Sequence, residues 1–163
     1  PLIEPLESRE VEKIREFVIV IDTSYSTSGE LVEQFLRETA NILHQSDSFF
    51  ARSVIRVLQC DNAVRSDAKI TGEQEMEVFL KNFTLLGGGG TDFRPAFSYV
   101  NDLLEQGELK ELAGLLYFTD GKGRYPAKRP DYRTAFLFLE DYDEAAVAPW
   151  AMRLLLEKEE FLN

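Results

Sequence analysis

Short apolar runs rich in β-branched and aromatic residues recur along the chain. The run Phe17–Ile21 is continuous and ends in polar residues, which is typical of a strand buried on both faces of a sheet. The same pattern predicts further strands at 53–60, 68–70, 115–119, 134–139 and 151–155. For the last of these the pattern alone fits a strand or a helix, and the preceding Pro149 favours the strand.

Three segments between these runs place apolar residues at helical spacing. The first follows Thr27, whose spacing from Glu30 fits a capping box, and it extends to Leu43. The other two are 73–83 and 93–105, each with an apolar stripe along one side. The apolar stripes indicate ordinary core packing, not a cofactor site.

The order of these elements predicts the fold. Strands that alternate with helices indicate an α/β fold, here a doubly wound, mostly parallel sheet of Rossmann-like type with helices on both faces. The link between the strands at 115–119 and 134–139 is near the minimum for a parallel crossover, so we expect no full helix there. The charged residues 1–16 are expected to be a lead-in segment or boundary, and one domain is expected over 17–163.

Composition and charge narrow the classes of partner. The formal net charge is -11, which disfavours nucleic acid phosphates and anionic lipid headgroups. The densest basic cluster is spread through one segment, and we interpret it as a solvated loop: Lys122, Arg124, Lys128, Arg129 and Arg133. No stretch approaches the ~20 apolar residues of a membrane helix. We therefore expect no nucleic acid partner, no membrane association and a cytoplasmic location.

The single cysteine and the single histidine exclude several kinds of site. Cys60 cannot form an internal disulfide, and with only His44 beside it there is no Cys- or His-rich zinc site. A Ser-His-Asp triad would have to use His44, which lies in a predicted helix. The chain begins at Pro1 and not at Met, so we expect it to be part of a longer protein.

Polar clusters follow two predicted strands and precede one predicted helix. These clusters are Asp22-Thr23-Ser24-Tyr25-Ser26, Thr91-Asp92 and Asp120. In open α/β sheets ligands bind beyond the carboxyl ends of the strands, so these side chains are expected to gather at one edge. Their oxygen donors suit Mg²⁺ or Mn²⁺. An ion held there with an open position could accept an acidic group from another molecule.

These residues resemble the metal-ion-dependent adhesion site (MIDAS) of von Willebrand factor A (VWA) domains. That family has D-x-S-x-S after the first strand, a Thr in a later loop and an Asp after a later strand. The matching positions are Asp22, Ser24, Ser26, Thr91 and Asp120. The resemblance implies a VWA fold in which the hydroxyls coordinate the cation and the carboxylates act directly or through water. It also implies a binding module for a protein partner with an acidic ligand residue.

The resemblance is closer to one bacterial branch of VWA-like proteins and covers about Phe17 to Met152. Its signatures here are GGGGTDFRP at 87–95, FTDG at 118–121 and Pro149-Trp150. Members of that branch often carry a metallopeptidase-like domain before the VWA-like one, and the resemblance suggests an ATPase-linked assembly as partner. This chain contains no H-E-x-x-H motif.

Several other interpretations fit parts of the pattern. Asp22 can be a turn residue and Ser24 a helix cap, and the domain can be a metal-free scaffold. Tyr25, where the family usually has Gly, favours that scaffold. An Mg-dependent phosphoryl-transfer enzyme would need D-x-D, and Ser24 occupies the second Asp position, so we expect no enzyme activity in this domain. Asp92 fits a second carboxylate near the ion or, more simply, a loop anchor.

Overall fold

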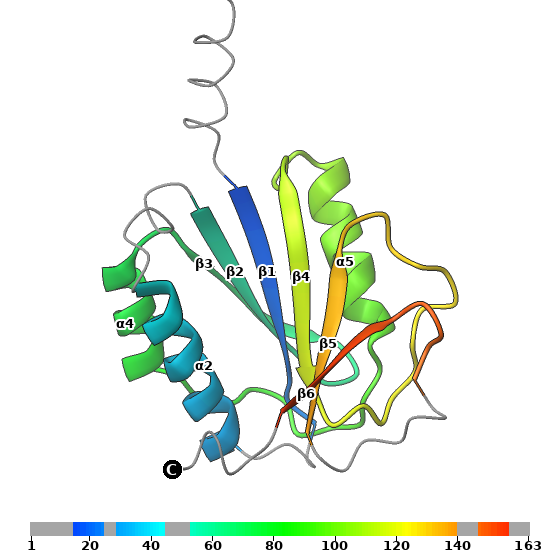
Figure 1. The fold of residues 1–163 in the computed structure, drawn as a ribbon, viewed down its shortest axis with the longest axis horizontal. Coiled ribbons are helices and arrows are strands. Elements are labelled where there is room, and N and C mark those ends of the chain that lie inside the picture. Colours follow the sequence, from blue (N-terminus) through cyan, green and yellow to red (C-terminus); the bar gives the residue numbers. More distant parts are fainter. Residues whose placement is uncertain (1–14, 25–28, 45–52, 140–146, 157–163) are drawn as a thin grey trace, which may run out of the picture.

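A six-stranded sheet organises the part of the chain that the structure describes. The computed structural model describes residues 15–24, 29–44, 53–139 and 147–156. The strands lie in the order β3-β2-β1-β4-β5-β6, with β1 and β4 at the centre (Figure 1). Their bounds are β1 Arg15–Asp22, β2 Ser53–Cys60, β3 Val64–Ile70, β4 Leu112–Thr119, β5 Thr134–Leu139 and β6 Met152–Leu156.

All pairings except one are parallel, which confirms the predicted α/β class with a mostly parallel sheet. The exception is β3, which pairs antiparallel with β2 after a short turn. β5 follows β4 in parallel with no helix between them, as expected. The strand predicted at 151–155 is present as β6. Of the lead-in segment predicted at 1–16, residues 1–14 lie outside the described residues, and Arg15 and Glu16 belong to β1.

The predicted strand at 68–70 is longer than its sequence pattern indicates. β3 already begins at Val64, and its first half is polar. Asp67 explains this, because its carboxylate accepts hydrogen bonds from Arg56 at 2.6 Å and from the Tyr99 hydroxyl at 2.6 Å. Such cross-strand and helix contacts stabilise an edge strand without apolar alternation, so the pattern could not reveal it.

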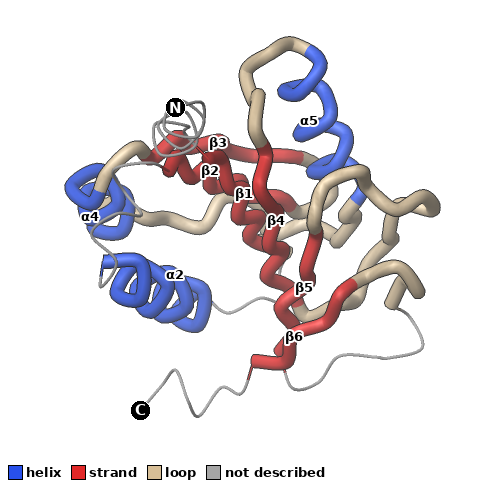
Figure 2. The backbone as a smooth tube through the Cα atoms, turned by 45° about the horizontal axis from the view of Figure 1, so that its top comes forward, coloured by secondary structure: helices blue, strands red, loops and turns tan. Residues whose placement is uncertain are grey.

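Helices cover the two faces of the sheet unequally. α2 (Gly29–His44) and α4 (Glu73–Lys81) lie on one face, and α5 (Arg94–Glu105) lies on the other (Figure 2). Alternate residues of each strand therefore enter two separate apolar clusters, one with α5 and one with α2 and α4. The prediction of helices on both faces is confirmed.

The α5 face is closed by aromatic rings. Phe136 stacks on Tyr117 with ring centroids 5.3 Å apart, and Phe93 meets the edge of Tyr117 at 5.0 Å. Trp150 contacts Phe97 at 6.2 Å and donates its indole N–H to the carbonyl oxygen of Pro126 at 3.0 Å. The rings of this face are fully or partly buried, and they fix the loop that follows β4 against the sheet.

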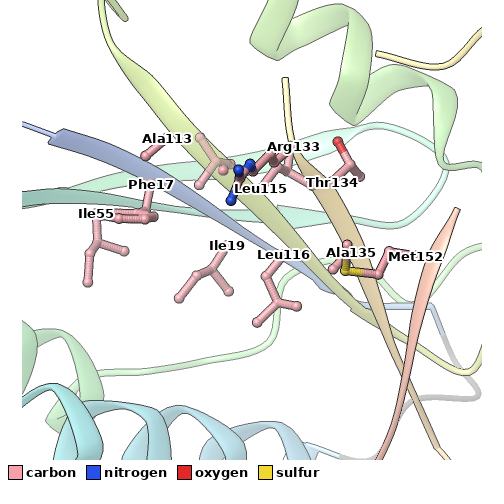
Figure 3. Close-up of a pocket in the computed structure, with 12 residues that line it drawn as sticks. Phe17, Ile19, Ile55, Ala113, Leu115, Leu116, Arg133, Thr134, Ala135 and Met152 are labelled. Carbon is pink, nitrogen blue, oxygen red and sulfur yellow. The ribbon is translucent and has the colours of Figure 1, made fainter. Parts of the chain in front are cut away.

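The opposite face is covered only in part by the described residues. α2 and α4 pack over β1 and β2, and Phe35 of α2 also stacks on Phe118 of β4. Beside them, side chains of β1, β4 and β5, with Met152 of β6, border an apolar pocket of about 400 Å³ (Figure 3). The residues that line this pocket come from neighbouring strands: Phe17 and Ile19 from β1, Leu116 from β4 and Ala135 from β5. At its rim Met152 is 61% exposed.

Candidate metal centre

The carboxyl ends of three adjacent strands meet at one edge of the sheet. β1 lies between β2 and β4, with Asp22 opposite Cys60 and Ile21 opposite Phe118. The residues that follow each strand end are therefore neighbours in space although they are far apart in the sequence. In Figure 1 the carboxyl ends of β1, β2 and β4 lie together at the lower edge of the sheet.

Asp22 is fully buried and tightly held. Its Oδ1 accepts a hydrogen bond from the Ser24 backbone N–H at 2.9 Å, and its Oδ2 accepts one from the Thr119 hydroxyl. The Thr119 hydroxyl oxygen in turn accepts the Gly121 N–H at 3.1 Å. Thr119 was not among the predicted site residues. The only hint in the sequence is its position directly before Asp120, at the end of a strand.

The charge balance around Asp22 favours a cation. Burial of the carboxyl raises the pKa of Asp22 above its ordinary value, and the negative charge of Asp120 acts in the same direction. The hydrogen bonds from Thr119 and Ser24 oppose these effects but do not cancel them. None of the ion pairs formed by the described residues involves Asp22. A divalent cation at this edge would supply the missing positive charge.

The other predicted ligands differ in how much the structure describes of them. Ser24 is buried beside Asp22, and Asp120 is nearly buried, with its Oδ1 accepting the Lys122 N–H at 2.9 Å. That contact forms a tight turn after β4, in which Gly121 has a φ of +85°. Ser26 lies outside the described residues.

Thr91 lies in a segment held between the ends of β2 and β4. The Asp92 N–H donates to the Asp61 carbonyl oxygen at 3.1 Å, and the Phe93 N–H donates to the Arg124 carbonyl oxygen at 3.0 Å. The Thr91 methyl group lies against Gly123, where an added Cβ would come within 2.7 Å of it. The fold thus brings Thr91 to the same edge as Asp22 and Asp120.

The glycine run serves contacts that the sequence did not reveal. A Cβ on Gly87 would lie 2.6 Å from the Thr23 hydroxyl oxygen, and the Gly87 φ of +135° is unfavourable for other residues. The Gly88 N–H donates to the Thr23 carbonyl oxygen at 2.8 Å. The Gly89 N–H donates to Asp61 at 3.1 Å. The run therefore packs directly on the D-x-S-x-S loop.

Asp61 is the anchor of this loop and was missed by the sequence analysis. Its buried carboxylate accepts hydrogen bonds from the Arg65 guanidinium at 2.7 Å, from the Ala63 N–H at 3.2 Å and from the Gly89 N–H. Its position directly after a buried strand, as for Asp22 and Asp120, is the feature that could have identified it.

Asp92 anchors its loop through Arg94. Its carboxylate forms two hydrogen bonds with the Arg94 guanidinium, at 2.8 and 2.9 Å. These bonds lower the pKa of Asp92 below its ordinary range. The charge of Asp92 is thus already balanced within the protein.

The donor chemistry at this edge is that of hydroxyl and carboxylate oxygens. Among the described residues no three His, Cys, Asp or Glu side chains form a metal-binding group. The oxygen donors that the described residues place at this edge are the Ser24 and Thr91 hydroxyls and the Asp22 and Asp120 carboxylates, which are of the kind that suits a hard divalent ion.

Within the parts of the chain that the structure describes, no helix is long and apolar enough to cross a bilayer.

The fold and the polar strand edge define an α/β domain of the Rossmann-like class, with its candidate ligand site beyond the carboxyl ends of the central strands. The chain belongs to the VWA-like domain (DUF2201) family, whose model matches residues 17–157. No curated protein matches the chain.

Solved structures share the fold at low sequence identity. Proximal thread matrix protein 1 from the mussel byssus is similar with a TM-score of 0.71 and 13% identity, over 92% of this chain and 46% of that protein. The same mussel protein has also been solved with a zinc-occupied MIDAS motif. The ArnB paralogue VWA2 from Sulfolobus acidocaldarius is similar with a TM-score of 0.62 and 17% identity, over 91% of this chain and 43% of that one. This chain spans less than half the length of either structure.

Proposed function

We propose that this VWA-like domain is a divalent-cation-dependent protein-binding module that captures an acidic group of a partner. The observation that carries the proposal is the environment of Asp22. This carboxylate is fully buried, has Asp120 as a charged neighbour and takes part in none of the ion pairs of the described residues. Burying such a group is costly unless a positive charge compensates it, and a bound cation would do so.

The residues that would hold the ion are Asp22, Ser24, Ser26, Thr91 and Asp120. Mg²⁺ or Mn²⁺ is the proposed ion, because both accept oxygen donors. When bound, such an ion would supply an electrophilic position that a carboxylate from another molecule can occupy. Thr119 and the backbone N–H of Ser24 would then hold the Asp22 carboxylate in one orientation.

The comparisons support the proposal at a coarser level. VWA-like domains are typically interaction modules, and the mussel protein binds zinc at its MIDAS motif. For this chain the acidic partner, an ATPase-linked assembly, a cytoplasmic location and the absence of enzymatic activity are parts of the proposal. The branch with a preceding metallopeptidase-like domain is likewise proposed as its origin.

Calorimetry with Mg²⁺ and Mn²⁺ tests the proposal. The parent domain should bind the ion, either alone or once acetate is added as a carboxylate to complete the coordination. Asp22→Ala and the double variant Ser24→Ala/Ser26→Ala should lose this binding. Asp102→Ala and Ser98→Ala remove an exposed carboxylate and an exposed hydroxyl of α5, and these control variants should bind like the parent.

Circular dichroism and thermal melting in EDTA would show that each variant folds. If the parent binds neither ion with or without acetate, or if Asp22→Ala binds as well as the parent, the proposed function is wrong.

A further inference from the structure

A basic loop stands out on this acidic protein. Residues 120–133, between β4 and β5, carry five cationic and two acidic side chains in a chain of net charge -11. The five cationic residues are all exposed: Lys122, Arg124, Lys128, Arg129 and Arg133. None of them takes part in the ion pairs of the described residues. Their positive charge is thus available to another molecule.

The loop and α5 together form a groove of about 630 Å³. Its apolar floor includes Phe97, Leu104 and Pro126, and its cationic rim consists of Arg94, Lys128 and Arg129. Glu105 and Asp131 also line it. Arg94, which is paired with Asp92, is the first residue of α5 and Glu105 is the last, so the groove follows the helix along its whole length.

The groove is held open by contacts that do not involve its cations. The Tyr125 hydroxyl donates to the Gly121 carbonyl oxygen at 3.0 Å, and the Tyr125 ring packs on Phe93 with centroids 4.7 Å apart. The Trp150 indole N–H holds the Pro126 carbonyl oxygen. A preformed groove lowers the entropy lost when a partner segment binds.

The end of the groove at Arg94 lies beside the candidate metal centre. The Arg94 guanidinium donates a hydrogen bond to the carboxylate of Asp92, the residue next to Thr91. The backbones of Asp92 and Arg124 form an isolated parallel β-bridge. The 12 residues of α5 span about 18 Å, which an extended peptide covers with roughly five or six residues. A segment whose carboxylate reaches the metal centre can therefore continue along the groove.

We infer that the partner presents an extended acidic segment with interspersed apolar residues, which lies in the groove between α5 and the β4–β5 loop. Lys128 and Arg129 contact its carboxylates, and the apolar floor receives its apolar side chains. The contribution of the metal centre rests on the proposed function above, whereas the groove contacts do not require a metal. A peptide is favoured over nucleic acid as the occupant because the groove has an apolar floor, on which apolar side chains can pack but a phosphate backbone cannot.

Fluorescence anisotropy with a labelled peptide of alternating glutamate and leucine tests this inference. The peptide should bind weakly in EDTA and more tightly in Mg²⁺. Lys128→Glu/Arg129→Glu should weaken binding roughly tenfold in both conditions, because two favourable ion pairs become repulsive. Lys81→Glu/Lys110→Glu makes the same change in net charge at exposed sites away from the groove, and it should leave binding near that of the parent.

Two further measurements separate the groove from the metal centre. Asp22→Ala should lose the gain in Mg²⁺ but keep the binding in EDTA, and Lys128→Glu/Arg129→Glu should keep Mg²⁺ binding in calorimetry. Peptide binding in EDTA that depends on Lys128 and Arg129 supports the groove even if no metal binds. Equal loss in the control variant, no peptide binding in either condition, or tighter binding of a single-stranded oligonucleotide would overturn the inference.

Discussion

The two faces of the sheet are packed in different ways. On the α5 face, aromatic rings from β4, β5 and α5 are stacked on one another, and Phe136 and Tyr117 are fully buried. On the face of α2 and α4 the cluster is mainly aliphatic, and beside it side chains of β1, β4 and β5 border a pocket in the described structure. The same strands contribute to both faces, so the difference comes from alternate residues of the same segments.

The difference matters because the rings of the α5 face extend to two segments of the candidate metal centre. Phe93 follows Thr91 closely and packs on Tyr117, while Tyr125 holds the turn after Asp120. Two of the predicted ligands are therefore positioned by the aromatic core. Mutations on the two faces should separate stability from ligand binding, and the following predictions run from the largest expected effect to the smallest.

Phe136→Ala should lower the free energy of unfolding by about 4 kcal/mol, because it removes a fully buried ring that contacts several other rings. Urea denaturation followed by circular dichroism measures the change. A loss below about 1 kcal/mol would mean that the α5 face is not the tightly packed core described here.

Gly123→Ala should cost about 2 kcal/mol, because the new methyl group would lie 2.7 Å from Thr91 Cγ2 and 2.9 Å from the Phe93 ring. Under the proposed function it should also weaken Mg²⁺ binding, since Thr91 must move. Gly90→Ala is the matched control, because a Cβ there meets nothing within 4 Å. Equal stability and equal Mg²⁺ affinity of the two variants would contradict the packing between Gly123 and Thr91.

Asp61→Asn should cost about 1.5 kcal/mol at pH 7, because it weakens charge-assisted bonds to Arg65 and to the glycine run. Burial opposes ionisation of this carboxyl, but the bonds from Arg65, Gly89 and Ala63 outweigh it and lower the pKa of Asp61. The folded state therefore binds the proton less tightly than the unfolded state.

The stabilisation by the Asp61 carboxylate is accordingly present above the unfolded pKa of about 4 and is lost as pH falls through the lower folded value. Urea denaturation of the parent and of Asp61→Asn from pH 7 to pH 3 should show their difference shrinking at the acid end. A difference that grows toward acid pH would refute this assignment.

Leu116→Ala should lower the free energy of unfolding by only about 1 kcal/mol. The Leu116 side chain is half-buried and lines the pocket on the face of α2 and α4, so its removal enlarges that pocket and creates no new enclosed cavity. Thermal and urea unfolding beside Phe136→Ala gives the direct comparison of the two faces. If Leu116→Ala costs as much as Phe136→Ala, the pocket beside Leu116 is filled or covered in solution.

Local patterns were enough to predict most of the sheet. β2 and β5 match their predicted ranges, and the buried runs of β1 and β4 were found although both strands begin earlier than predicted. β4 also includes Leu112 and Gly114, which pair through their backbones with Glu16 and Phe17 of β1 on either side of an irregularity in the register. The apolar pattern of the side chains shows which residues are buried, whereas the hydrogen-bonded pairing of the backbones continues past the buried residues.

The candidate site was predicted only in part. Its aspartates could be found because they stand at strand ends, but the partner of Asp22 is Thr119, 97 positions away in the chain. Asp61 and the first half of β3 were missed for the same reason, since their stabilising contacts come from Arg65, Gly89, Arg56 and Tyr99 in three dimensions. The spacing of apolar residues along the chain does not indicate such contacts.

By itself the sequence determined the class of fold and the polar residues that follow the strands, because burial on a sheet imposes a local pattern of apolar runs. Only the tertiary structure decided which of these residues meet, that the glycine run packs on Thr23, and that the basic loop forms a groove with α5. These outcomes depend on strand order and register, which join segments distant in the chain and are set by the packing of the whole domain.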